Sequence, residues 1–190
     1  MHLAIARQAL TQLGLSQIHW MVSGFAPHKP CIASPADRLA MVQCVLAQEN
    51  DSRMLANDFE VKASLEGRLS YTIDTLRALA DAYPGRQLVL IIGSDQAHHF
   101  ETWLDWQSIF SLASLAVAGR PGFDASGLAT KCESFGARFT QLEITPDDIS
   151  ATAIRTEFEA SRVSVGGISD GVALYIREHD LYLSPKTTQG

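Results

Sequence analysis

The sequence has few cysteines, no excess of positive charge and no long apolar run, and each absence excludes a class of protein. Cys31, Cys44 and Cys132 are odd in number, far apart and lack metal-ligand spacing, so we expect free thiols in a reducing cytosol. The net charge of −6 argues against a surface that coats nucleic acid, and any anion site must be a local cluster. We find no signal peptide, no internal repeat and no apolar run of about 18 residues, so we expect a cytoplasmic protein away from the membrane.

What is present is ordinary for a soluble globular protein, with 46% hydrophobic and 19% charged residues. A length of 190 residues is enough to bury a sizeable core and is natural for one domain. We therefore expect a single domain over residues 1–183, followed by a polar tail at residues 184–190.

Helical and strand-like patterns alternate along the chain. Continuously apolar runs predict strands at 17–22, 87–92, 114–118 and 138–144, with weaker candidates near Met54 and Val61. Helices are expected at 2–13, from 35 to about 48, from 70 to Pro84, near Ser108, at 125–135 and at 172–179, with a loop between 93 and 103. Strands that are apolar throughout favour an α/β fold with a doubly wound parallel sheet covered on both faces.

Two helix starts carry clear signals. Ser34, Pro35 and Asp37 supply a hydroxyl cap, a proline at the first helical position and an acid three residues after the cap. In the second, Ser150 precedes an Ala-rich run that includes Thr152 and Arg155. A helix N-terminus with hydroxyl donors and a guanidinium suits a phosphate, although an ordinary capped helix with a surface arginine explains the same residues.

The loops at 23–30, 93–103 and 119–122 and the helix start at 149–155 all follow predicted strands. Because ligands bind beyond the carboxyl ends of parallel strands, we expect these segments to line one rim of the sheet. A doubly wound domain usually opens with a strand, whereas this chain opens inside a helix at His2. We therefore expect that a first strand upstream is missing.

Several segments together resemble bacterial nicotinate mononucleotide adenylyltransferase, of the nucleotidyltransferase superfamily with a Rossmann-like fold. They occur in the family's order and cover nearly the whole chain: residues 2–6, 27–30, 70–76, 91–95, 102–103, 119–122, 149–155 and 175–179. The family's first strand, its glycine-rich phosphate loop and the first histidine of its HxGH motif have no counterpart, which indicates a truncated start.

The resemblance implies a phosphate-binding set. His2 stands at the catalytic histidine that ends HxGH, and Arg155 belongs with it to the catalytic group. Ser150 and Thr152 fall in the IS[SA]TxIR signature that holds the ATP phosphates, and Lys29 follows Pro-His at a position that also faces phosphate. Read without the family, His2 is a frayed terminal residue and Lys29 a solvated loop lysine.

The resemblance also implies a nicotinate and ribose set. Backbone amides at Tyr71-Thr72 and at Leu104 would take the nicotinate carboxylate, and Trp103 would stack on the pyridine ring. Gly93 and Asp95 would meet the adenosine ribose. The plainer interpretations are that Trp103 covers core, as we expect for Trp106, and that Asp95 is a turn residue. His98 and His99 are assigned no metal, because no acid or cysteine cluster joins them.

The implied reaction joins ATP, with Mg²⁺, to nicotinate mononucleotide and gives nicotinate adenine dinucleotide and pyrophosphate. The alternatives are a related adenylyltransferase acting on another acceptor such as phosphopantetheine, a non-catalytic nucleotide-binding module, and nicotinamide in place of nicotinate. Backbone amides favour the acid, because an amide would turn its own N–H₂ donors toward them. Oligomeric state is left open.

Overall fold

A computed structural model describes residues 2–24, 33–119, 123–144 and 167–182. The chain divides into two compact units. Unit 1 combines Met1–Ser16 with Ser70–Asp147, and unit 2 combines Gln17–Leu69 with Asp148–Gly190. Each unit contains a parallel sheet whose strands are separated in sequence by helices, as the alternating pattern predicts.

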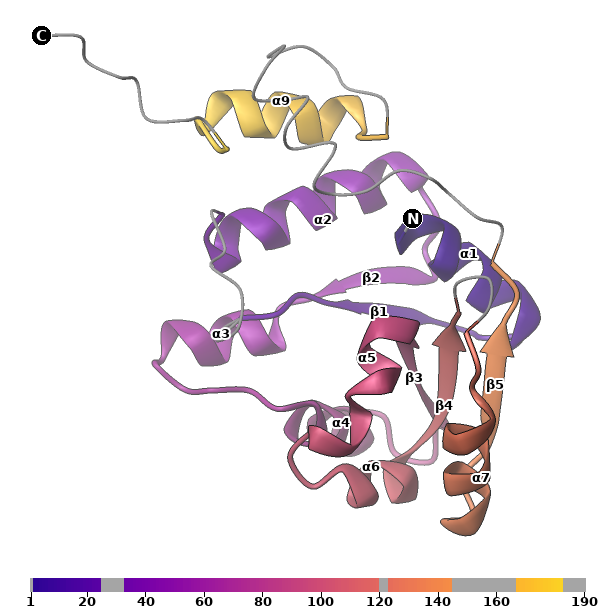
Figure 1. Ribbon diagram of the computed structural model, residues 1–190. Coiled ribbons are helices and arrows are strands. Elements are labelled where there is room, and N and C mark those ends of the chain that lie inside the picture. Colours follow the sequence, from indigo (N-terminus) through magenta and orange to yellow (C-terminus); the bar gives the residue numbers. More distant parts are fainter. Residues whose placement is uncertain (1, 25–32, 120–122, 145–166, 183–190) are drawn as a thin grey trace, which may run out of the picture. The chain divides into compact units, whose positions relative to one another are not determined.

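Unit 1 contains a three-stranded parallel sheet in the order β3-β4-β5 (Figure 1). The strands are β3 (Leu88–Gly93), β4 (Ala113–Ala118) and β5 (Phe139–Leu142). The helices of this unit are α1 (His2–Gln12), α4 (Thr72–Ala82), α5 (Ser94–His98), α6 (Trp106–Leu112) and α7 (Ser126–Ser134), with a 3₁₀ helix, η1, at Phe100–Thr102. Because β4 is central, five of its six residues are buried.

An aromatic cluster anchors the core of unit 1. The Phe100 side chain is fully buried, with its ring centroid 5.3 Å from those of Phe110 and Trp103. Trp106 packs against Phe110 at 5.9 Å and so covers core, as expected. Cys132 is also buried, and the loss of solvation raises the pKa of its thiol to about 11, so it behaves as a small apolar side chain.

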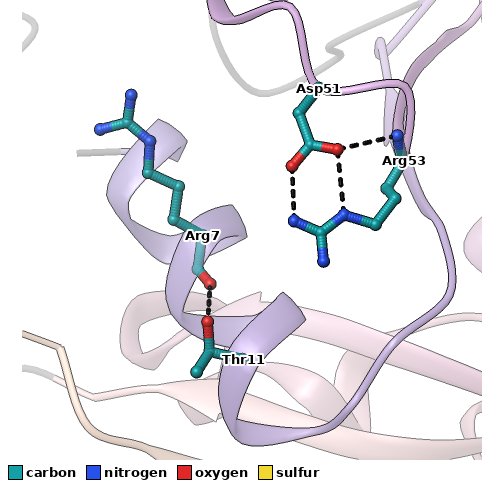
Figure 2. A network of polar contacts seen from close by, with 4 residues as sticks. All are labelled: Arg7, Thr11, Asp51 and Arg53. Atoms are coloured by element: carbon teal, nitrogen blue, oxygen red, sulfur yellow. Dashed lines mark hydrogen bonds and ion pairs between the residues drawn. The ribbon is translucent and has the colours of Figure 1, made fainter.

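Helix α1 is tied to the end of β5. The Gln12 side-chain amide donates to the Glu143 carbonyl at 2.8 Å and accepts from the Glu143 N–H at 3.0 Å. The Gln12 side chain thus satisfies both backbone groups of the residue that directly follows β5. Within α1 the Thr11 hydroxyl donates to the Arg7 carbonyl at 3.1 Å (Figure 2), and Gly14, at a φ of +60°, follows the helix as a C-terminal stop.

Unit 2 contains the two-stranded parallel sheet of β1 (Ile18–Met21) and β2 (Met54–Asn57). Its helices are α2 (Pro35–Glu49), α3 (Phe59–Leu65) and α9 (Asp170–Glu178). Before β2, Asp51 and Arg53 form an ion pair at 2.6 Å (Figure 2), which lowers the pKa of Asp51 to about 2. Helix α9 packs on α2 through Val172, Ala173 and Ile176, and the Tyr175 hydroxyl donates to the Asp37 carboxylate of α2 at 3.0 Å.

Two local predictions were wrong. The segment near Val61 is helical in α3 rather than a strand, and both Val61 and Ala63 are buried in that short helix. The segment between 93 and 103 is not a plain loop, because it holds α5 and η1 around the buried Phe100. Within the described ranges, no helix has the length and apolar character needed to cross a membrane.

Candidate functional site

The site residues that lie in the described part of the chain all belong to unit 1. They come from three places: the start of α1, the start of α4, and the stretch from the end of β3 to the start of α6. The implied phosphate residues Lys29, Ser150, Thr152 and Arg155 lie outside the described residues, so their placement stays a prediction.

At the carboxyl end of β3, Gly93 caps the start of α5 and Asp95 lies in its first turn. The Asp95 side chain folds back over the glycine, and a Cβ at Gly93 would stand 2.7 Å from Asp95 Oδ1. Any larger residue at 93 would displace that carboxylate. The glycine therefore lets an exposed acid lie against the strand end, where ligands of parallel sheets bind.

His2 begins α1 and interacts electrostatically with Asp95. The protein atoms around the imidazole lower its pKa by desolvation, and the Asp95 carboxylate opposes this by favouring the charged form. The residue nevertheless stays exposed, so a ligand can reach the ring. An approaching phosphate would add negative charge and shift the same equilibrium further toward imidazolium.

The first turn of α4 is open. Tyr71 precedes the helix in an extended conformation, with φ −108° and ψ 154°, and its side chain makes no capping hydrogen bond. The carbonyl of Tyr71 accepts from the N–H groups of Asp74 and Thr75 at 3.0 and 3.1 Å. The Thr72 N–H has no acceptor among the described residues. This leaves the Thr72 backbone donor, at the positive end of an eleven-residue helix, without a capping side chain.

The second donor lies in the turn between η1 and α6. Trp103 is partly buried, and its N–H donates to the Phe100 carbonyl at 3.1 Å. The next residue, Leu104, is 54% exposed, and within the described part of the chain its N–H also lacks an acceptor. Asp105 then turns the chain with a left-handed φ of +50°. An exposed Leu104 is consistent with a backbone rather than a side-chain role.

Three side chains that the sequence did not single out brace segments within their own unit. Arg77 of α4 donates to Asp105 at 2.8 Å, and Gln12 pairs with Glu143. In unit 2, Arg38 of α2 donates to the Ser23 carbonyl, to the Gly24 carbonyl at 3.1 Å and to the Ala33 carbonyl at 3.3 Å. No sequence signal marks these pairs, because their partners are 5 to 131 residues away and most are backbone atoms.

The described histidines and acids form no metal centre. Within residues 2–24, 33–119, 123–144 and 167–182, no group of three or more His, Cys, Asp or Glu side chains could hold an ion. His98, for example, is exposed and makes an edge-on contact with Phe123, with ring centroids 5.1 Å apart.

Known proteins that are similar to this chain carry related names. The model of the cytidylyltransferase-like family matches residues 1–157. A protein from Laribacter hongkongensis, named probable nicotinate-nucleotide adenylyltransferase, is 37% identical over 200 residues, which cover 96% of this chain and 88% of that protein. A protein of the same name from a Synechococcus strain is 36% identical over 190 residues, which cover 97% of this chain and 91% of that protein.

A solved structure extends the likeness to the fold. Plasmodium falciparum nicotinic acid mononucleotide adenylyltransferase complexed with NaAD matches with a TM-score of 0.73, over 95% of this chain and 89% of that one. The identity of 15% means that this match shows the fold alone, which is the predicted Rossmann-like α/β arrangement.

Proposed function

This chain belongs to the nicotinate-nucleotide adenylyltransferase family of cytidylyltransferase-like proteins, and from that membership we propose that it makes nicotinate adenine dinucleotide from ATP and nicotinate mononucleotide. The phosphate oxygen of the mononucleotide attacks the α-phosphorus of ATP in line. The new O–P bond forms as the bond to the bridging oxygen breaks, and pyrophosphate leaves with its electron pair. No protein nucleophile is needed.

One observation in the structure supports the acid as acceptor. The Thr72 and Leu104 N–H groups come from different elements of unit 1, and neither has an acceptor among the described residues. A carboxylate has two oxygens that accept hydrogen bonds, whereas a carboxamide would present N–H₂ donors to the same amides. Unpaired donors facing donors are strongly disfavoured, so the amide pair selects nicotinate over nicotinamide. Tyr71 directly precedes Thr72 in the chain, and Trp103 is proposed to stack on the pyridine ring of nicotinate.

Electrostatic stabilisation is the proposed source of the rate. Desolvation lowers the pKa of His2, and the Asp95 carboxylate and an approaching phosphate would oppose that shift, so that His2 would place positive charge at the α-phosphate, where Lys29 and Arg155 would join it. Ser150 and Thr152 would hold ATP phosphates, while Gly93 and Asp95 meet the ribose. We propose that ATP arrives as its Mg²⁺ complex, with the ion held mainly by phosphate oxygens, as is usual for magnesium at nucleotides.

The wider setting follows from the same proposal. We propose that residues 1–183 act as one nucleotidyltransferase domain with residues 184–190 as a tail. We propose a cytoplasmic enzyme whose partners are small molecules rather than nucleic acid, in keeping with its net charge of −6 and free thiols at Cys44 and Cys132. Self-association is best measured directly, by sedimentation of the purified chain.

The decisive experiment is pyrophosphate release from Mg-ATP with nicotinate mononucleotide, run beside nicotinamide mononucleotide and phosphopantetheine. We expect turnover with the acid and at least about 100-fold less with the amide, because the amide would leave polar groups of a specific site unpaired. Turnover on phosphopantetheine alone would establish the related adenylyltransferase instead. Binding of nicotinate mononucleotide without pyrophosphate release would establish the binding module.

A further inference from the structure

We propose that Arg77 and Asp105 form a positioning clamp, which holds the Leu104 amide at a fixed distance from the open first turn of α4 and so sets affinity and selectivity for the nicotinate carboxylate. This inference rests on the proposed function and adds to it two residues that do not touch the substrate. Both belong to unit 1, as do the two amides that the clamp would align.

The Arg77 guanidinium bridges two segments. Its Nη2 lies 2.8 Å from Asp105 Oδ2, in the turn before α6, and its Nη1 lies 3.7 Å from Asp74 Oδ1, in the first turn of α4. The turn is thereby held beside the helix start that carries the Thr72 amide. A planar guanidinium with a fork of donors suits this bridge better than an ammonium, which acts as a single point.

Asp105 is fixed from its other side as well. Its Oδ1 accepts from the Ser108 hydroxyl at 2.7 Å, and its carbonyl accepts from the Ser108 N–H at 3.0 Å. Its left-handed φ of +50° is one that Asp and Asn adopt more readily than most residues. Asp105 therefore joins α6 to Arg77 directly after Leu104.

Leu104 lies between two residues that are held in place, Trp103 and Asp105. On one side Trp103 is held by Phe100, through ring packing at 5.3 Å and a backbone hydrogen bond of 3.1 Å. On the other side is Asp105. Leu104 itself is 54% exposed and contributes no buried side chain, so its neighbours determine where its amide points. Because two amides from separate elements must reach one carboxylate, a small change in their separation weakens both hydrogen bonds.

An ordinary surface ion pair is the competing interpretation. The Arg77 and Asp105 side chains are 52% and 41% exposed, so their contribution to the free energy of unfolding is small. Thermal stability therefore cannot reveal the clamp, whereas nicotinate affinity can. Lys131 and Glu101 form an ion pair in the same unit with similar exposures of 41% and 55%, and that pair serves as a matched control.

The test measures KM for each substrate, and kcat, in Arg77→Gln, Asp105→Asn and the double variant. Asn is chosen at 105 because it keeps the left-handed backbone conformation. We expect KM for nicotinate mononucleotide to rise about three- to tenfold in each single variant and no further in the double variant, as for coupled residues. KM for ATP and kcat should stay within about twofold, and the preference for acid over amide should fall.

Further arms separate the possible failures. Arg77→Lys should recover part of the affinity, and Lys131→Gln should match the wild type. If the wild type transfers adenylyl to nicotinate mononucleotide and Arg77→Gln has the same KM, the clamp is overturned and the proposed function stands. Equal losses in Lys131→Gln, or parallel rises in KM for ATP, also overturn the clamp. If the wild type shows no transfer, the proposed function fails and the clamp fails with it.

Discussion

Helices α2 and α4 are of similar kind but begin in opposite ways. At α2 the Ser34 hydroxyl accepts from the Asp37 N–H at 3.1 Å, and the Asp37 carboxylate accepts from the Ser34 N–H at 3.1 Å. Pro35, at the first position, has no N–H to satisfy. At α4 Tyr71 supplies no side-chain cap and Thr72 keeps a backbone donor without an acceptor among the described residues.

The difference separates a helix start built for stability from one left available to a ligand. A side-chain cap is worth about 0.5–2 kcal/mol, which α4 forgoes. Helix α4 is instead held by its buried face, where Ile73, Thr75 and Leu76 are each no more than 5% exposed. The first turn can therefore stay chemically open without loss of the helix. The following substitutions exchange these properties between the two helices.

Thr72→Pro should have the largest effect. It gives α4 the first residue of α2, removes the backbone N–H, and suits both the first helical position and the extended Tyr71 before it. A hydrogen bond to a charged group is worth about 1.5–3 kcal/mol, so KM for nicotinate mononucleotide should rise about 10- to 150-fold. Thr72→Ala, which keeps the N–H, is the control, and a similar loss in that variant would contradict a backbone role.

Tyr71→Asp should act nearly as strongly by occupying the open turn from within. A carboxylate at the cap position can accept from the first-turn amides and would compete with the substrate. We expect the unfolding midpoint to rise slightly while KM for nicotinate mononucleotide rises about tenfold or more. Tyr71→Phe should change neither value. Unaltered affinity in Tyr71→Asp would mean that the first turn of α4 is not the carboxylate site.

Ser34→Ala should produce the reverse pattern, with stability lost and substrate affinity kept. Removal of the cap should cost about 1 kcal/mol, which lowers the melting temperature of a chain of this size by about 2–4 °C. Calorimetry of the wild type and Ser34→Ala measures the difference. A melting temperature equal to that of the wild type would show that the capping box of α2 is dispensable.

The smallest expected effect is on the stability of the protein at low pH. Hydrogen bonds from the Ser34 hydroxyl, and then from Tyr175, lower the pKa of Asp37 below its ordinary 3.8. Because the folded pKa is the lower one, this stabilisation is complete above pH 3.8 and is lost as the pH falls through the folded value. The free energy of unfolding, measured by circular dichroism between pH 5 and pH 2, should therefore fall less steeply with decreasing pH in Asp37→Asn than in the wild type. Identical slopes would contradict this role of Asp37.

Much of the fold was predictable because its signals are local. Apolar runs located β3, β4 and β5, and the capping signature at Ser34 located the start of α2 to the residue. The prediction near Val61 failed because the apolar residues at 59, 61, 63 and 65 alternate with polar ones, a period of two that is typical of a strand, although the segment folds as a helix. The helices around Phe100 were missed because tertiary burial of that ring, rather than a periodic pattern, organises the segment.

The site was predictable as a set of residues but not as an arrangement. Family motifs pointed to Thr72 and Leu104, yet nothing near either residue in sequence indicates that Arg77 reaches Asp105, which lies 28 positions later. The open start of α4 was equally hidden, because Ser70 and Thr72 are both common cap residues, whereas the structure has Tyr71 at the cap position. Whether Lys29 and Arg155 meet the phosphates stays a prediction.

The pairing of Gln12 with Glu143 has a consequence for how the protein is made. The two residues are 131 positions apart, so α1 leaves the ribosome long before the strand that it binds. At about 5–20 residues per second, α1 waits on the order of ten seconds for β5. Meanwhile the whole segment of unit 2 from Gln17 to Leu69 emerges. Helix α1 is thus secured to β5 only late in synthesis, and its apolar face is a natural target for chaperones during that interval.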